Sequence, residues 1–317
     1  MDRGIFPDEL NAKRIADIQA QERRSTMDQD RYLKGMLERT ALFYPMASLE
    51  KIRNTEVAIA GLGGVGAIAA ELLARWGIKR FRLLDKDRYD PSNLNRQLFA
   101  TSKTLGLYKV DVAIDRIKEI NPSAEIGVAI KDRVDNKNVH TFVKGAGVVI
   151  QTADSPSCQL FYRAARGYRI PIVNGYSTIT GCRIQTYDYR KDSWAYRLEE
   201  YRDRIKRKGR KDLTEMTRDE LDSFDNQVMH PAMPTMNFVT NIAGALIVTE
   251  AIKLLTNTGS VCKYPRAFDI NLYHQKAKRL HLYSPFRVET FRKILDRNKG
   301  KERFSELIRQ KKASVGL

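Results

Sequence analysis

The sequence predicts an α/β fold built on a doubly wound, mostly parallel β-sheet. From Glu56 to about residue 176, short apolar runs alternate with helical patterns, which is typical of parallel sheets. The string GLGGVG at residues 61–66 satisfies G-x-G-x-x-G directly after the first apolar run and opens a helical pattern. The alternation stops after Gly181. We therefore expect a Rossmann-like sheet with late antiparallel strands, an N-terminal helical arm and a C-terminal helical tail.

The expected elements follow one another along the chain. Gly77 ends the first helix and Asn121-Pro122 ends the second, because glycine suits a helix cap and proline cannot continue a helix. Strands are expected at residues 56–61, 79–85, 124–130, 147–152 and 171–176, and helices at 65–76, 107–119, 135–144 and 156–168. Later come a strand at CRIQTYDYR, a long apolar helix over residues 237–256, and two paired strands at AFDINLYH and KRLHLYS.

Three regions are expected. Residues 1–50 form a helical arm for dimer or substrate contacts, residues 51–284 form the main domain, and residues 285–317 form a basic helical tail. Within the main domain, residues 191–230 are a highly charged crossover insertion that we expect to be mobile.

Charge and composition narrow the class of protein. A formal net charge of +18 implies an anionic partner: a nucleic acid, an acidic peptide, a membrane surface or nucleotide phosphates. The N-terminus lacks an apolar targeting core, and the most apolar run is interrupted by Glu250 and Lys253, so we expect a cytoplasmic protein without a membrane span. Three scattered cysteines, Cys158, Cys182 and Cys262, favour buried thiols over disulfides or a four-thiolate zinc site.

The glycine loop predicts a nucleotide site. Gly61 permits the tight turn, Gly63 lets backbone amides approach a phosphate, and Gly66 lets the helix pack on the strand. Asp85 ends the next strand 19 residues after Gly66, where a carboxylate accepts hydrogen bonds from a ribose. These glycines fit a nicotinamide dinucleotide and ATP equally well.

The residues after Asp85 favour ATP. A carboxylate that attacks the α-phosphate builds negative charge on that phosphorus and on the leaving pyrophosphate, and fixed cations stabilise this charge. Arg96 and Lys109 are candidates for these cations, in a segment that also carries Asn93 and Gln97. Asp154 ends the strand GVVIQTAD at the sheet edge where such folds bind ligands, and is a candidate Mg²⁺ ligand.

These motifs resemble those of the ubiquitin-activating-enzyme-like ThiF/MoeB/HesA adenylyltransferase superfamily. The matching strings between Lys51 and Asp154 are GLGGVG, LLDKD, SNLNRQ, GLYKV, INP and TAD, and PTMNFVTNIAGALIVTEAIKLL is similar to a late family helix. The resemblance implies ATP and Mg²⁺ as cofactors and AMP-forming activation of a carboxylate. It implies catalytic roles for Arg96, Lys109 and Asp154, with Asp154 also the metal ligand, and nucleotide binding by Gly61, Gly63, Gly64, Gly66, Asp85, Asp87, Asn93 and Gln97.

The sequence departs from the family in three places. It lacks the two Cys-x-x-Cys pairs that bind zinc in many relatives, so no zinc is expected. Met229 and His230 stand where thioester-forming relatives have a cysteine; we interpret His230 as a loop residue and Cys182 as a buried strand residue. Family dimers insert a basic residue of an Arg-Tyr-x-Arg string into the neighbour's ATP site, and here Lys34 or Arg39 would take that role.

The resemblance and its departures favour adenylation of a carboxylate on a peptide or protein, followed by intramolecular condensation. This is the chemistry of the peptide-tailoring branch, represented by MccB and by PaaA of pantocin biosynthesis, which acts on ribosomal precursor peptides. The basic run 202–211 could hold an acidic peptide. Three alternatives stay open: activation of a ubiquitin-like or sulfur-carrier protein, a tRNA threonylcarbamoyl-adenosine dehydratase, for which no RNA-binding module is recognised, and a non-catalytic nucleotide-binding module.

Overall fold

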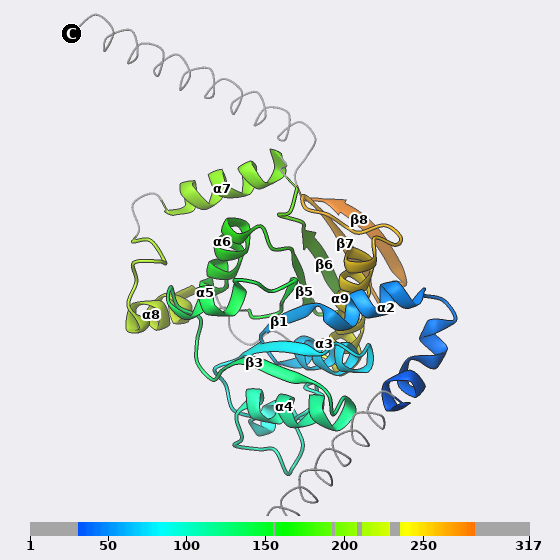
Figure 1. The fold of residues 1–317 in the computed structure, drawn as a ribbon. Helices are drawn as coiled ribbons and strands as arrows, with labels where there is room; N and C mark the ends of the chain where they lie inside the picture. The colour runs from blue at the N-terminus through cyan, green and yellow to red at the C-terminus, as the bar shows by residue number, and fades with distance from the viewer. Residues whose placement is uncertain (1–30, 155, 192–193, 208–210, 229–234, 283–317) are drawn as a thin grey trace, which may run out of the picture.

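One mixed sheet organises the chain (Figure 1). The computed structural model describes residues 31–282 except 155, 192–193, 208–210 and 229–234. Its strands run in the order β3-β2-β1-β4-β5-β6-β7-β8; the first five are parallel and the last three are antiparallel. The strands are β1 (Glu56–Ala60), β2 (Arg80–Leu84), β3 (Glu125–Ile130), β4 (Val148–Gln151), β5 (Ile172–Ser177), β6 (Gly181–Tyr187), β7 (Arg266–Asn271) and β8 (Lys276–His281). The predicted fold class is confirmed.

Helices cover both faces of the sheet. One buried cluster joins the sheet to α2 (Met46–Asn54), α3 (Gly64–Arg75), α4 (Lys109–Ile120) and α9 (Asn237–Thr256). The other joins it to α5 (Asn138–Val143), α6 (Gln159–Tyr168), α7 (Trp194–Arg207) and α8 (Arg218–Val228). Residues 31–41 are also helical, and two short 3₁₀ turns are η1 (Pro91–Asn93) and η2 (Pro156–Cys158).

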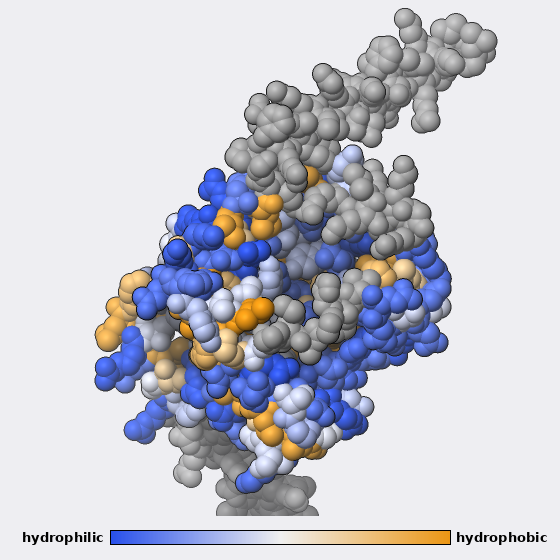
Figure 2. All heavy atoms as spheres, turned by 180° about the vertical axis from the view of Figure 1, so that it is seen from behind, coloured by the Kyte–Doolittle hydropathy of each residue, from blue (hydrophilic) through white to orange (hydrophobic). Residues whose placement is uncertain are grey.

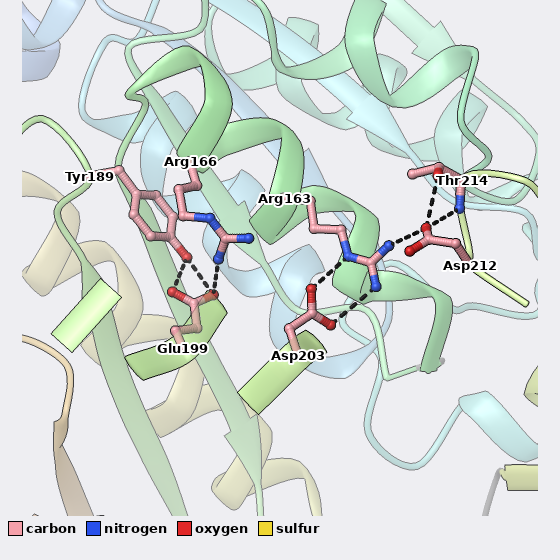
Figure 3. A network of polar contacts seen from close by, with 7 residues as sticks. All are labelled: Arg163, Arg166, Tyr189, Glu199, Asp203, Asp212 and Thr214. Carbon is pink, nitrogen blue, oxygen red and sulfur yellow. Dashed lines mark hydrogen bonds and ion pairs between the residues drawn. The ribbon is translucent and has the colours of Figure 1, made fainter. Parts of the chain in front are cut away.

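The crossover insertion contains two packed helices that the sequence analysis missed. α7 and α8 lie in the segment expected to be charged and mobile, and their buried Leu198 and Leu221 explain why they pack. Arg163 of α6 donates to Asp203 of α7 at 2.9 Å and to Asp212 at 2.7 Å, and the neighbouring Arg166, Tyr189 and Glu199 form a second contact (Figure 3). The charged residues of the insertion therefore form ion pairs with the core in addition to contacting solvent.

α9 has the length and composition of a membrane span, with a mean hydropathy of 1.6, but 61% of that window is buried. It packs on α3, β5 and β6, and the approach to α3 is close: a Cβ added to Gly244 would lie 2.5 Å from Ile68. Its apolar character is accounted for by its place in the core.

The expected tail at 285–317, most of the expected arm, and Met229 and His230 lie outside the described residues.

Candidate nucleotide-binding site

Packing explains three of the four loop glycines. Gly61 adopts φ +87°, and a Cβ there would lie 2.7 Å from the Ala153 nitrogen. A Cβ on Gly66 would lie 1.9 Å from the Gly61 oxygen, and one on Gly64 would lie 2.8 Å from a Thr240 methyl. Because no real Cβ tolerates such distances, these positions require glycine to bring β1, α3, α9 and the loop after β4 together.

Gly63 differs from the other three. A Cβ on Gly63 would meet nothing nearer than the Gln97 amide nitrogen, at 3.7 Å, and its backbone is in an ordinary extended conformation. The protein itself therefore has room for a side chain here. Gly63 is also the N-cap of α3 and supplies no side-chain cap, so the helix terminus is open to an anion. This is the arrangement expected where a phosphate approaches the backbone.

Asp85 supports the glycine loop directly. One of its carboxylate oxygens accepts from the Leu62 amide at 2.6 Å, and the other accepts from the Asp87 amide at 2.8 Å. Burial raises the pKa of Asp85, and the charge of Lys109 opposes this shift. Asp85, the residue predicted to bind a ribose, thus lies at the carboxyl edge of the sheet, where β1–β5 end. Its hydrogen bonds also connect the loop after β1 to the loop after β2.

Lys109 is buried at the first position of α4 and is held by Asp87. Its ammonium nitrogen lies 2.9 Å from an Asp87 carboxylate oxygen, and its amide donates to the Asp87 carbonyl at 3.0 Å. The Asp87 side chain is half exposed, so this pair opens to solvent on the acid's side. A bound phosphate could compete with Asp87 for the cation.

The loop that carries Asn93, Arg96 and Gln97 lies against the glycine loop. Asn93 is buried and its side-chain oxygen accepts from the Asp90 amide at 3.2 Å, so it shapes η1. Arg96 donates to the Ser92 carbonyl at 2.7 Å and does not pair with Asp90, while its own carbonyl accepts from Thr240. These bonds place the loop between η1 and the start of α9.

Gln97 faces Gly63 from this loop. Its side chain is buried, and its amide oxygen has no hydrogen-bond partner within the described structure. A buried polar atom without a partner is costly, so this oxygen has the capacity to accept a hydrogen bond from water or from a ligand hydroxyl, while the amide nitrogen is the atom nearest to Gly63. Tyr89, which the sequence analysis did not select, has a similarly unpaired buried hydroxyl whose pKa is raised by burial and by Asp85. No sequence pattern distinguishes Tyr89 from a core tyrosine.

Asp154 follows β4 at the same edge and is exposed. It is anchored near the glycine turn, because Thr152 donates from its hydroxyl to the Gly61 carbonyl at 2.9 Å. Among the described residues no group of three or more His, Cys, Asp or Glu side chains could hold a metal. A single carboxylate still fits Mg²⁺, which commonly takes one or two carboxylates and completes its shell with phosphate oxygens and water.

Lys34 and Arg39 lie away from this edge. Their helix is fastened at the other end of the sheet, where the Tyr32 hydroxyl donates to the carbonyl of Ile120, at the end of α4, at 2.9 Å. Leu37 lies beside Gly77, which follows α3. The ends of α3 and α4 lead into the amino ends of β2 and β3, opposite the glycine loop. The fold therefore brings the other predicted residues together and leaves these two apart.

The cysteines are poor nucleophiles. Burial raises the pKa of Cys182 to about 11 and that of Cys158 to about 12, and it also raises the pKa of Cys262. Because the thiolate is the reactive species, these thiols are largely unreactive near neutral pH. This agrees with the expectation of a buried Cys182.

Comparisons with known proteins agree with the resemblance seen in the sequence. The tRNA threonylcarbamoyladenosine dehydratase of Bacillus subtilis is 44% identical over 108 residues, which are 34% of this chain and 42% of that protein. The same enzyme of Escherichia coli is 36% identical over 137 residues, which are 42% of this chain and 50% of that protein. The chain thus spans about half the length of these relatives. The molybdopterin-synthase adenylyltransferase of Salmonella typhimurium is 28% identical over 212 residues, 66% of this chain and 76% of that protein.

Solved structures share the fold. PaaA superposes with a TM-score of 0.61 at 18% identity, covering 81% of this chain and 84% of that one. E. coli MccB superposes with a TM-score of 0.62 at 19% identity, and the superposition covers 80% of this chain and 71% of the MccB chain. The sequence profile of the ThiF family matches residues 37–289. The chain therefore belongs to the ThiF family.

Proposed function

We propose that the protein uses ATP to adenylate a carboxylate at the carboxyl edge of the sheet, between the glycine loop, the loop 93–97 and Asp154. The observation that carries this proposal is the open Gly63 backbone at the uncapped start of α3, faced by the amide nitrogen of the buried Gln97 side chain, a donor that suits a phosphate oxygen. An ATP phosphate chain at this position explains why Gly63 has no side chain. The ThiF family and its adenylyltransferase relative support the same chemistry.

In the proposed reaction, a substrate carboxylate oxygen attacks the α-phosphorus, the bond to the β-phosphate breaks, and pyrophosphate leaves. The amides at the start of α3 bind the phosphates, and Asp85 accepts from the ribose. Arg96 and Lys109 stabilise the charge on the leaving pyrophosphate, with Lys109 moving from Asp87 to the phosphate. Asp154 would hold Mg²⁺, which supplies further positive charge to the phosphates when bound.

Pyrophosphate exchange into ATP tests this proposal. Asp154→Ala and Arg96→Ala should each abolish exchange while the thermal unfolding temperature stays close to wild type, because both side chains are at least partly exposed. Cys182→Ser should leave exchange unchanged. Lys118→Ala, on the exposed face of α4, is the matched control. Wild-type exchange in the Asp154 variant would overturn the assigned role.

For the substrate, we favour a peptide, activated and then condensed with a nucleophile of its own. The raised pKa values of Cys158, Cys182 and Cys262 support a reaction without a thioester on the enzyme. The neighbour MccB was solved with AMPCPP and MccA, which supports a peptide-sized substrate at this kind of site. The likeness to the Salmonella enzyme keeps a carrier-protein carboxylate as a competitor.

A tRNA substrate is the second candidate, favoured by the 44% identity to the B. subtilis dehydratase and by the net charge of +18. Exchange measured with a precursor peptide, with tRNA and with a ubiquitin-fold protein in separate reactions distinguishes these substrates. Stimulation by one of them identifies the branch. No exchange with any of the three, together with tight ATP binding, would favour a non-catalytic nucleotide-binding module.

We also propose a homodimer that brings Lys34 or Arg39 to the neighbour's site. Leu42, Phe43 and Met46 expose 84%, 79% and 58% of their surface where the helix 31–41 joins α2, and apolar side chains are visible at that margin in Figure 2. A second copy would cover them. In mixed dimers, Lys34→Ala in one subunit should inactivate only the other subunit's site; loss confined to its own site would contradict a trans contact.

A further inference from the structure

A hollow lies at the opposite edge of the sheet from the proposed nucleotide site. It has a volume of 390 Å³ and is bordered by the loop before β7, the start of β7, the end of β8 and the start of α7. β6 is antiparallel to β5, and β7 is antiparallel to β6, so β7 begins and β8 ends at the amino edge of the parallel strands. Figure 1 shows α7 beginning beside this end of β8. The hollow is therefore separate from the proposed nucleotide site at Gly63.

The lining of this hollow is strongly basic. Four of its nine residues are Lys263, Arg266, Arg279 and His281, and none is acidic. Arg266 pairs in register with His281, and Arg279 lies two residues earlier on the same strand, so these side chains share one face of the sheet. Diagonal neighbours of this kind lie roughly 7–8 Å apart, within reach of one small anion for long side chains.

Nearby carboxylates do not neutralise these arginines. Asp188 accepts from Arg190 at 2.6 Å and from Lys263 at 3.3 Å. Glu250 pairs with Lys253 and accepts from the Cys262 amide at 2.7 Å. Within the described residues, Arg266 and Arg279 have no carboxylate partner. Two like charges on adjacent strands repel each other unless an anion lies between them.

The start of α7 adds positive potential to the same place. Ala195, in the first turn of this 14-residue helix, lines the hollow, and the first turn carries no acidic residue. The amide dipoles of a helix give its amino end a partial positive charge that favours anions. The helix terminus, the cavity and the basic side chains are independent features that meet at one point.

We propose that this basic hollow, lined by Lys263, Arg266, Arg279 and His281, binds a phosphate group. Guanidinium groups match tetrahedral phosphate oxygens through paired N–H donors, and several cations in one hollow suit a dianion better than a single carboxylate. The phosphate could be free or part of an RNA backbone, whose phosphates bind to basic surfaces. This site is independent of the proposed adenylation.

The test compares Arg266→Ala/Arg279→Ala with a charge-matched control, Lys118→Ala/Lys144→Ala, whose lysines are exposed on other elements. The probes are inorganic phosphate, titrated by calorimetry, and a fluorescein-labelled 12-nucleotide single-stranded RNA, followed by anisotropy. Because phosphate also suits a glycine loop, the basic hollow is identified by the binding that the arginine variant loses and the control retains. We expect a loss of about tenfold or more.

The two sources of phosphate give different results. If the ligand is free phosphate, calorimetry alone detects the loss. If it is RNA, the affinity for RNA falls and the slope of log affinity against log salt decreases by roughly 1–2, because two phosphate contacts are removed. Arg266→Lys/Arg279→Lys keeps the charge and removes the paired donors, and should lie between wild type and the alanine variant. Equal binding by the alanine variant and the control, or equal affinity for a 12-residue polyglutamate peptide, would overturn the proposal.

Discussion

Asp225 of α8 accepts two hydrogen bonds from Ser157, one from its amide and one from its hydroxyl, each at 2.8 Å. Arg133, from the loop after β3, donates to the same carboxylate at 3.0 Å, and all three side chains are buried. Ser157 lies in η2, three residues after Asp154. The crossover insertion is thus fastened to the loop that carries the candidate magnesium ligand.

Replacing Asp225 should destabilise the fold. Asp225→Ala leaves the buried Arg133 without this partner and removes both acceptors from Ser157, so the free energy of unfolding should fall by about 3–5 kcal/mol. Urea denaturation followed by circular dichroism measures this change. Asp222→Ala is the matched control, since Asp222 also contacts Arg133 but is 51% exposed, and its loss should cost about 1 kcal/mol or less. Equal losses in the two variants would show that burial of Asp225 is not the cause.

Glu199 should make stability depend on pH. Burial raises its pKa from the ordinary 4.5 to about 7, with Arg166 opposing the shift, and the Tyr189 hydroxyl donates to it at 2.8 Å. Between about pH 4.5 and pH 7, the Glu199 carboxyl group is therefore protonated in the folded protein and ionised in the unfolded chain. As pH rises from about 4.5 to about 7, this group lowers the free energy of unfolding by on the order of 3 kcal/mol.

Glu199→Gln removes this titration and keeps a side chain of similar shape. The free energy of unfolding of wild type minus that of the variant should decrease as pH rises through this window and then level off. Chemical denaturation at half-unit steps from pH 4.5 to 8 gives the difference curve. A difference that grows with pH would mean that the Arg166 ion pair, 3.4 Å away, outweighs the burial of the carboxylate.

The glycine loop offers a matched pair of substitutions. Gly63→Ala should change the free energy of unfolding by about 1 kcal/mol or less and weaken ATP binding about tenfold or more, because the new methyl group occupies space that only a ligand would use. Gly66→Ala should cost about 3 kcal/mol or more, because its Cβ would overlap the Gly61 carbonyl. Calorimetric ATP titration and urea denaturation separate the two effects. Unchanged ATP affinity in the Gly63 variant would mean that phosphates bind elsewhere.

Arg163 should control how tightly α7 is held. Its side chain is 14% exposed and pairs with both Asp203 and Asp212, so Arg163→Met leaves two partly buried carboxylates without this partner. Amide hydrogen exchange over residues 194–207 should become faster, while exchange in β1 stays unchanged. The matched control is Lys211→Met, whose pair with Glu220 is nearly half exposed and should have little effect. Equal exchange in the two variants would show that apolar contacts alone hold α7.

The succession of strands and helices and the mostly parallel sheet could be predicted because apolar runs and helix signals alternate in the sequence. The resemblance likewise indicated Asp85, Lys109 and Asp154, and the fold places all three at one sheet edge. The helices α7 and α8 could not be predicted in the same way. Their segment has a high charge density, and the acids that pair with Arg163 and Arg133 look in the sequence like solvated residues.

The amino-acid sequence by itself determined the α/β fold class, the glycine loop and the acids and cations that follow it, because these depend on local spacing along the chain. Only the tertiary structure separated Gly63, which has room for a side chain, from three neighbouring glycines that packing requires. It alone placed Lys34 and Arg39 away from the nucleotide edge and joined Arg266 to Arg279 in the basic hollow. These relationships depend on distances between segments remote in sequence, and local patterns carry no record of such distances.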